Sequence, residues 1–213
     1  MNFEEIKKAI KEWSKVRSSP EKVLAYFKQG SCFKIERSQF EKWNSKLPET
    51  LHVHMGIFNR RLKIILVDSV SDKDPAAHQD SFFVQDYLDG LTKAEEGFID
   101  VAVDGGLTVV DALKAVMQWN VFVNSWVNET VHTTDGIFQA FYVPFNDLKS
   151  QFDNPAHLES VVFFGLRDNF KADLILFGLN ASGGSKTLLK AAKPLGIPVE
   201  NLATPVPPFG PGQ

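Results

Sequence analysis

Two histidines on a predicted strand are the residues in this chain best suited to chemistry. His52 and His54 lie two positions apart in an apolar run from Leu51 to Phe58, so both imidazoles project from one face of an extended strand. Imidazole nitrogens bind Zn²⁺ and related ions, but a metal site needs a third and usually a fourth ligand. Asp68, at the end of the next predicted strand, is one candidate for the third. The alternatives are a metal pair at His52 and His54 and a polar strand face.

A glycine-rich segment at 178–187 is the second candidate site. It contains Gly183, Gly184, Ser185 and Lys186, follows a predicted strand and precedes a helical pattern. Backbone amides in such a loop, together with a helix N-terminus, can hold phosphate. The P-loop pattern has lysine directly after its second glycine, whereas other residues intervene here. The alternatives are an anion or phosphate site at these four residues and a turn in which Ser185 caps the helix.

Other catalytic patterns are incomplete or absent. Asp100 and Asp104 are four positions apart on one predicted strand, which separates them by about 13 Å, too far for a pair of cooperating carboxylates. The sequence has no nucleophile elbow, no dinucleotide-binding glycine loop and no Cys–His arrangement with local context. Whether the protein is an enzyme is therefore uncertain, with the pattern leaning against it, and the cofactor is unknown.

Adjacent aromatic residues recur on the predicted strands, as in Phe141–Tyr142 and Phe163–Phe164. Neighbours on a strand point to opposite faces. Either helices cover both faces of the sheet, or some rings are exposed as a surface that binds an apolar ligand or another protein.

Composition excludes several classes of protein. The net charge of -3 and the pI near 6.0 lack the basic excess of a nucleic-acid-binding protein. The single cysteine, Cys32, excludes an intrachain disulfide, and its place beside Phe33 predicts a buried thiol. No apolar run approaches the ~18 residues of a membrane span, and residues 1–5 lack the apolar core of a secretory signal. We expect a cytoplasmic protein without nucleic-acid or membrane partners.

Local patterns predict the elements that would position these residues. Helical spacing of apolar residues predicts helices at 3–16 and from Pro20 to about Phe27. Thr108 and Asp111 resemble a capping box that opens a helix from Val109 to about Trp126. This helix is apolar on most sides in its second half, so we predict that it is the central buried helix.

Two segments 108 positions apart have the same order of elements. Each has a strand, a short helix capped by Ser38 or Asn146, and two paired strands, at about 32–68 and 140–177. This predicts a single globular domain over 1–213 with two pseudo-repeated halves, 1–104 and 105–203, and an extended proline-rich tail, 204–213. The order resembles the duplicated strand–helix–strand–strand modules of gyrase-inhibitor-like ligand-binding domains. That resemblance implies small-molecule binding between the halves.

Together these patterns predict an α+β fold. We expect a mostly antiparallel sheet of six or more strands, the central helix and the N-terminal helices packed on it, and a possible pseudo-twofold duplication. The expected function is non-enzymatic binding of a small molecule or a protein. The alternatives are a hydrolase or transferase with a site of dispersed residues, and a phosphate- or nucleotide-binding protein that uses the 178–187 loop. The oligomeric state is not predicted.

Overall fold

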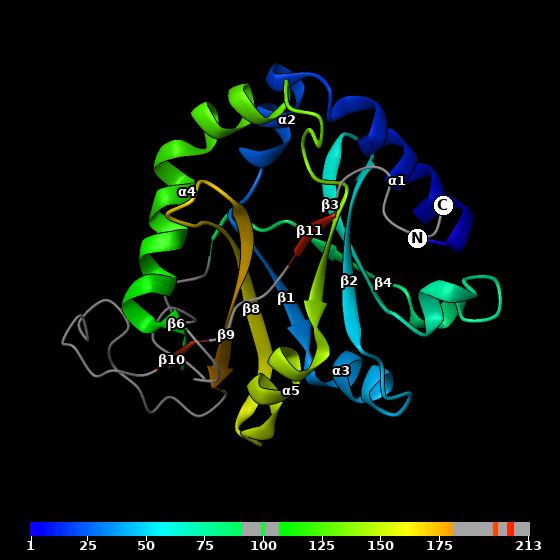
Figure 1. The fold of residues 1–213 in the computed structure, drawn as a ribbon. Coiled ribbons are helices and arrows are strands. Elements are labelled where there is room, and N and C mark those ends of the chain that lie inside the picture. Colours follow the sequence, from blue (N-terminus) through cyan, green and yellow to red (C-terminus); the bar gives the residue numbers. More distant parts are fainter. Residues whose placement is uncertain (91–98, 101–106, 181–197, 200–203, 207–213) are drawn as a thin grey trace.

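The structure is a computed structural model that describes residues 1–90, 99–100, 107–180, 198–199 and 204–206 (Figure 1). Five helices and eleven strands lie in these ranges, with two short 3-10 helices, η1 and η2, between β3 and β4. In chain order the elements are α1 (Phe3–Val16), α2 (Pro20–Phe27), β1 (Cys32–Glu36), α3 (Arg37–Asn44), β2 (Thr50–Phe58), β3 (Arg61–Asp68), η1 (Ser71–Lys73), η2 (Gln79–Ser81), β4 (Phe83–Asp86), β5 (Ile99–Asp100), β6 (Leu107–Thr108), α4 (Val109–Thr130), β7 (Ala140–Pro144), α5 (Phe145–Asp153), β8 (His157–Leu166), β9 (Ala172–Asn180), β10 (Pro198–Val199) and β11 (Thr204–Val206).

The strands form two main antiparallel sheets, which confirms the α+β class but not the predicted single sheet of six or more strands. One sheet has the order β11-β7-β2-β3-β4, the other has β1-β8-β9-β5, and β10 pairs with β6 in a separate ribbon. The split arises because β1 pairs with β8 whereas β7 pairs with β2. The first strand of each predicted half therefore joins the hairpin of the other half.

The main hydrophobic core takes residues from both sheets. Met55 and Ile64 come from the five-stranded sheet, and Phe164 and Leu174 come from the four-stranded sheet. The Phe164 ring lies 6.0 Å from the ring of Phe141 on β7, between centroids. Large side chains on both inner faces are best removed from water when the sheets pack against each other, as in a β-sandwich.

Helix α1 covers the outer face of the five-stranded sheet (Figure 1). It begins and ends where its sequence pattern predicts, and Asn2 caps it by accepting a hydrogen bond from the Glu5 amide. Ile6 and Ala9 of α1 pack on Ile65 of β3. The helix can come this close because β2 carries glycine at position 56, where a Cβ would lie 3.1 Å from the Cβ of Ala9.

Helix α4 lies on the outer side of the four-stranded sheet (Figure 1) and is not the central buried helix that its sequence predicts. Thr108 caps it as expected, accepting a hydrogen bond from the Asp111 amide. Ala112 and Ala115 pack on β9, but Met117 and Val121 are 66% and 67% exposed. The prediction of full burial was wrong because apolar residues surround the helix while the sheet covers only one of its faces.

Helices α3 and α5 begin earlier than predicted. Their N-caps are Glu36 and Pro144, so Ser38 and Asn146 are the second helical residues instead of caps. The two helices meet where the Phe40 ring stacks on that of Phe152, 4.8 Å away between centroids. The matched caps therefore no longer support the predicted duplication, which stays a prediction.

At the paired aromatic residues, one ring of each pair faces the core and the other is partly buried on the outer face of its sheet. Phe141 faces the core, while Tyr142 stacks on His52 on the outer face. Phe164 is likewise in the core, and Phe163 packs in the smaller clusters beside it. Cys32 is fully buried, as predicted. Within the described ranges, no helix has the length and hydrophobicity needed to cross a membrane.

Candidate metal centre

Alternation along β2 directs its two histidines to one face. Leu51, Val53 and Met55 are fully buried in the core, so His52 and His54 project from the outer face of the sheet. They are only partly buried there, with side chains that are 13% and 16% exposed. This location leaves both imidazoles within reach of a ligand from solvent.

Asp72 completes a cluster with these histidines. It lies in η1, after β3, and its Oδ2 atom is 2.6 Å from His52 Nδ1 and 3.4 Å from His54 Nε2. One candidate ligand atom from each residue can be chosen so that all three lie within 4.8 Å of one another. Among the described residues, no other grouping of three histidine, cysteine or acidic side chains meets this condition.

Asp68, the third ligand suggested by the sequence, lies on the wrong face of the sheet. In the β2–β3 ladder it is opposite Leu51, whereas His52 is opposite Val67. Asp68 therefore shares the inner face with Leu51, and its side chain is fully buried. A shift of one residue in a strand moves a side chain to the other face, which is why the sequence assignment was wrong.

A buried network behind η1 holds the segment that carries Asp72. Asp68 accepts hydrogen bonds from the backbone amides of Val70 and Ser71 and from the Ser71 hydroxyl. Lys46 donates to the hydroxyls of Ser71 and Ser81, at 2.7 and 2.5 Å. Both serines are fully buried, so this Ser–Lys arrangement has no access to substrate. Its effect is to fix the position of η1.

Asp72 is ionised in this setting. Burial by itself would raise the pKa of its carboxyl group, but hydrogen bonds and electrostatic interactions with His52 and His54 outweigh burial and hold that pKa well below its ordinary value. A carboxylate beside two imidazoles is a donor set that suits divalent transition metals.

Neighbouring side chains orient the imidazole of His52. The Tyr142 ring stacks on that of His52, 4.0 Å away between centroids. The other ring nitrogen of His52, Nε2, is 3.1 Å from the Thr50 hydroxyl, the kind of outer contact that orients metal-binding histidines. Nδ1 of His54 is buried and has no hydrogen-bond partner among the described residues. Burial and the charge of Asp72 raise the pKa of Tyr142, so its hydroxyl stays protonated at neutral pH.

Two of the three separations between ligand atoms can be compared with those in a metal site. Ligand atoms about 2.0–2.2 Å from a tetrahedral Zn²⁺ are roughly 3.3–3.6 Å from one another. The separation between His54 and Asp72 is already 3.4 Å, and that between His52 and Asp72 would have to open from 2.6 Å.

The second predicted site, Gly183, Gly184, Ser185 and Lys186, lies outside the described residues. The other histidines do not join the cluster. His132 is exposed, and the Nδ1 atom of buried His157 is 2.7 Å from the carbonyl oxygen of Gln151. Asp104 also lies outside the described residues.

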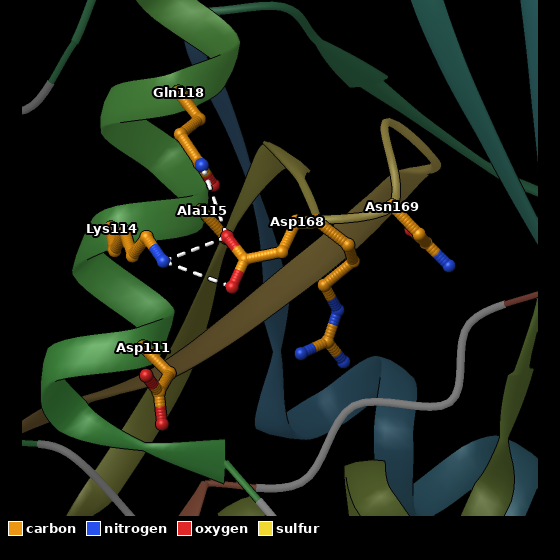
Figure 2. Close-up of a pocket in the computed structure, with 7 residues that line it drawn as sticks. Asp111, Lys114, Ala115, Gln118, Asp168 and Asn169 are labelled. Atoms are coloured by element: carbon orange, nitrogen blue, oxygen red, sulfur yellow. Dashed lines mark hydrogen bonds and ion pairs between the residues drawn. The ribbon is translucent and has the colours of Figure 1, made fainter.

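A polar groove of about 420 Å³ lies between α4 and the turn that joins β8 to β9. Figure 2 shows the side chains of Lys114 and Gln118 directed from α4 toward Asp168 in that turn. Arg167, which also lines the groove, donates to the buried carboxylate of Asp173 at 2.8 Å. These charges are matched within the protein, so the groove is a weaker candidate for a ligand site than the histidine cluster.

Sequence reasoning found the two histidines but missed Asp72. Its segment reads as a polar exposed loop, with Asp72 and Asp74 equivalent in the sequence. The sequence does contain a signal that could have found Asp72. Because β3 ends beside the first residues of its antiparallel partner β2, a short loop directly after β3 must lie near that part of β2. No protein-family model, curated protein or solved structure matches the chain.

Proposed function

We propose that the protein is a binding protein whose His52, His54 and Asp72 hold one divalent transition-metal ion. The observation that carries the proposal is the convergence of three ligand atoms from two separate segments on one partly buried point. Zn²⁺ is the ion that best suits two imidazoles and one carboxylate, and Fe²⁺ or Co²⁺ would also bind such a set.

Three protein ligands leave at least one coordination position open. The ion would therefore be able to hold a small molecule with an oxygen or nitrogen donor, which fits the small-molecule binding expected from the sequence. Tyr142, beside His52, would supply a hydrogen-bond donor and an aromatic wall next to such a ligand.

A hydrolase is the second candidate, favoured by the same open position. Sites with three protein ligands occur in zinc enzymes, where the metal lowers the pKa of a bound water. A hydrolase would also need a general acid or base beside the metal, whereas binding needs neither, so binding remains the preferred function.

Metal titration tests the proposal directly. We expect the protein to bind one Co²⁺ or Zn²⁺ per chain in isothermal titration calorimetry, with visible absorption bands of low-coordinate Co²⁺. The thermal midpoint should rise with added metal, because a ligand of the native state stabilises it. The variants His52→Ala, His54→Ala and Asp72→Asn should each lose most of this affinity.

The matched control is His132→Ala, which removes an exposed histidine outside the cluster. It should bind metal like the wild type. Failure of the wild type to bind one ion, or equal loss of binding in His132→Ala, would contradict the proposal and leave the cluster as a hydrogen-bonded network only.

The internal duplication also stays a proposal. It is supported by the reciprocal pairing of β1 with β8 and of β7 with β2, the arrangement expected if two equivalent halves exchanged their first strands. A phosphate site at 183–186 and the cytoplasmic location likewise stay predictions.

A further inference from the structure

The loop that carries Asp72 is joined at both of its ends to one lysine. Lys46, just after α3, donates hydrogen bonds to the hydroxyl of Ser71 at 2.7 Å and to that of Ser81 at 2.5 Å. Ser71 directly precedes Asp72 in η1, and Ser81 is the last residue of η2. Residues 72–80 therefore begin and end at a single ammonium group.

The ammonium group of Lys46 lies in a largely buried polar network. The side chain of Lys46 is 23% exposed, and its Nζ is 3.6 Å from the fully buried carboxylate of Asp68. The hydroxyl of Ser71 accepts a hydrogen bond from Lys46 and donates one to Asp68 at 2.5 Å. An apolar side chain of similar length could fill this space, but it has no donor for either serine. The specific contribution of the lysine is therefore to join η1 to η2.

The η2 end of this connection has an anchor of its own. The indole N–H of Trp43 donates to the carbonyl oxygen of Ser81 at 3.0 Å, and Trp43 is fully buried in the main core. Lys46 therefore ties Ser71, the residue next to Asp72, to a point that the core already holds in place.

Asp72 depends on this loop in a way that the two histidines do not. His52 and His54 lie on β2, which pairs with β3 on one side and with β7 on the other. Their positions are fixed by two strand ladders. Asp72 lies in a three-residue 3-10 helix, so the position of its carboxylate depends on how the loop is anchored.

We infer that Lys46 is a positioning residue of the metal centre, which sets the affinity for the ion by holding the loop that carries Asp72. The inference rests on the proposed function, because it assigns Lys46 a role at the same site. Lys46 acts through Ser71 on the third ligand and leaves the two histidines in place. Loss of an outer contact that orients a metal ligand typically weakens metal binding by about 10–100-fold.

Lys42 provides a matched control, because it reaches the same loop from four residues earlier in the chain. Its Nζ is 2.8 Å from Oδ2 of Asp80, and the two side chains are 39% and 74% exposed. An exposed ion pair of this kind contributes little to stability. Lys42→Met therefore removes one lysine contact with the loop but leaves the contact between Lys46 and Ser71 intact.

Isothermal titration calorimetry with Cu²⁺ tests the inference. Cu²⁺ binds imidazole more tightly than the neighbouring divalent ions do, which keeps binding measurable when one ligand is weakened or lost. Lys46→Met should weaken binding by about 10-fold or more relative to the wild type. Lys42→Met should bind Cu²⁺ like the wild type.

A double-mutant cycle with Asp72→Asn separates positioning from a general loss of stability. In the Asp72→Asn background, Lys46→Met should change the affinity by less than about 2-fold, because the ligand through which Lys46 acts is already lost. A general loss of stability would weaken binding equally in both backgrounds.

The double variant Lys46→Met/Asp68→Asn avoids an unpaired buried charge. Its amide oxygen can still accept hydrogen bonds from the backbone of η1, so the variant should stay folded by circular dichroism and show the same weakened binding as Lys46→Met. A wild type that binds no ion would overturn the proposed function and this inference together. A wild type that binds, with unchanged affinity in both Lys46 variants or with equal losses in both Asp72 backgrounds, would overturn this inference alone.

Discussion

Asp72 joins two histidines through a single oxygen atom. Its Oδ2 is the near partner of both His52 and His54, so the orientation of one carboxylate sets the geometry of the whole cluster. That carboxylate is placed by residues that do not touch the histidines. Asp68 and Lys46 fix Ser71, the residue before Asp72, from the buried side.

Asp173 is a second carboxylate with an altered affinity for protons. It is 6% exposed. Burial raises the pKa of Asp173 to about 6, although the hydrogen bond from Arg167 opposes this rise. Because the pKa is higher in the folded protein than in the unfolded chain, the folded state is relatively favoured when the group is protonated. This contribution is complete below about pH 4 and is lost as the pH rises through 6.

The pH dependence of an Asp173→Asn variant tests this effect. The difference in the free energy of unfolding, variant minus wild type, should become more positive by up to about 3 kcal/mol as the pH rises from 4 to 7. Urea unfolding at several pH values measures the difference. Asp153→Asn, at an exposed site, should show a smaller change, and a pH-independent difference for Asp173→Asn would contradict the prediction.

At the scale of elements, α4 shows how one helix can serve the core and the surface. Trp119 is 4% exposed, and its ring centroid lies 5.2 Å from those of Phe27 and Phe164. It therefore links α4 to α2 and to the inner part of the fold. Leu113, one of the residues that made the helix look central in the sequence, is only partly buried.

Substitutions along α4 should reflect this division. Trp119→Ala should lower the free energy of unfolding by about 3–5 kcal/mol, because it removes a large buried ring. Leu113→Ala should cost less than that, and Met117→Ala should cost less still. Chemical denaturation measures all three, and equal costs at Trp119 and Met117 would show that the helix packs differently.

At the scale of the whole molecule, the two halves of the chain are interlocked. The main core draws Phe33 and Met55 from the first half and Phe141 and Leu174 from the second. Each β-hairpin has on one side a strand supplied by the other half. Neither half can complete its sheet or cover its apolar residues alone.

Fragments of the chain provide the test. Residues 1–90 expressed alone should give no cooperative unfolding transition, because β8, which pairs with β1, and β7, which pairs with β2, are missing. Mixing this fragment with residues 107–213 should restore native-like circular dichroism and a cooperative transition. A fragment 1–90 that folds stably as a monomer would contradict the interlocked arrangement.

The sequence by itself determined the features that depend on near neighbours. Helical spacing located α1 and α4, and apolar runs located the β2–β3 hairpin, with boundaries within a few residues. The period of two along a strand placed His52 and His54 on one face, and the cap at Thr108 was correct. These features follow from backbone geometry over a few residues, so no distant contact is needed to produce them.

Only the tertiary structure decided which surfaces meet. It selected Asp72 over Asp68 as the neighbour of the histidines, because strand register turns Asp68 inward and η1 brings Asp72 back over β2. It divided the strands into two sheets by pairing β1 with β8, and it left one apolar side of α4 exposed. An apolar pattern indicates that a surface favours burial. Which part of the protein covers that surface depends on contacts between residues far apart in the chain.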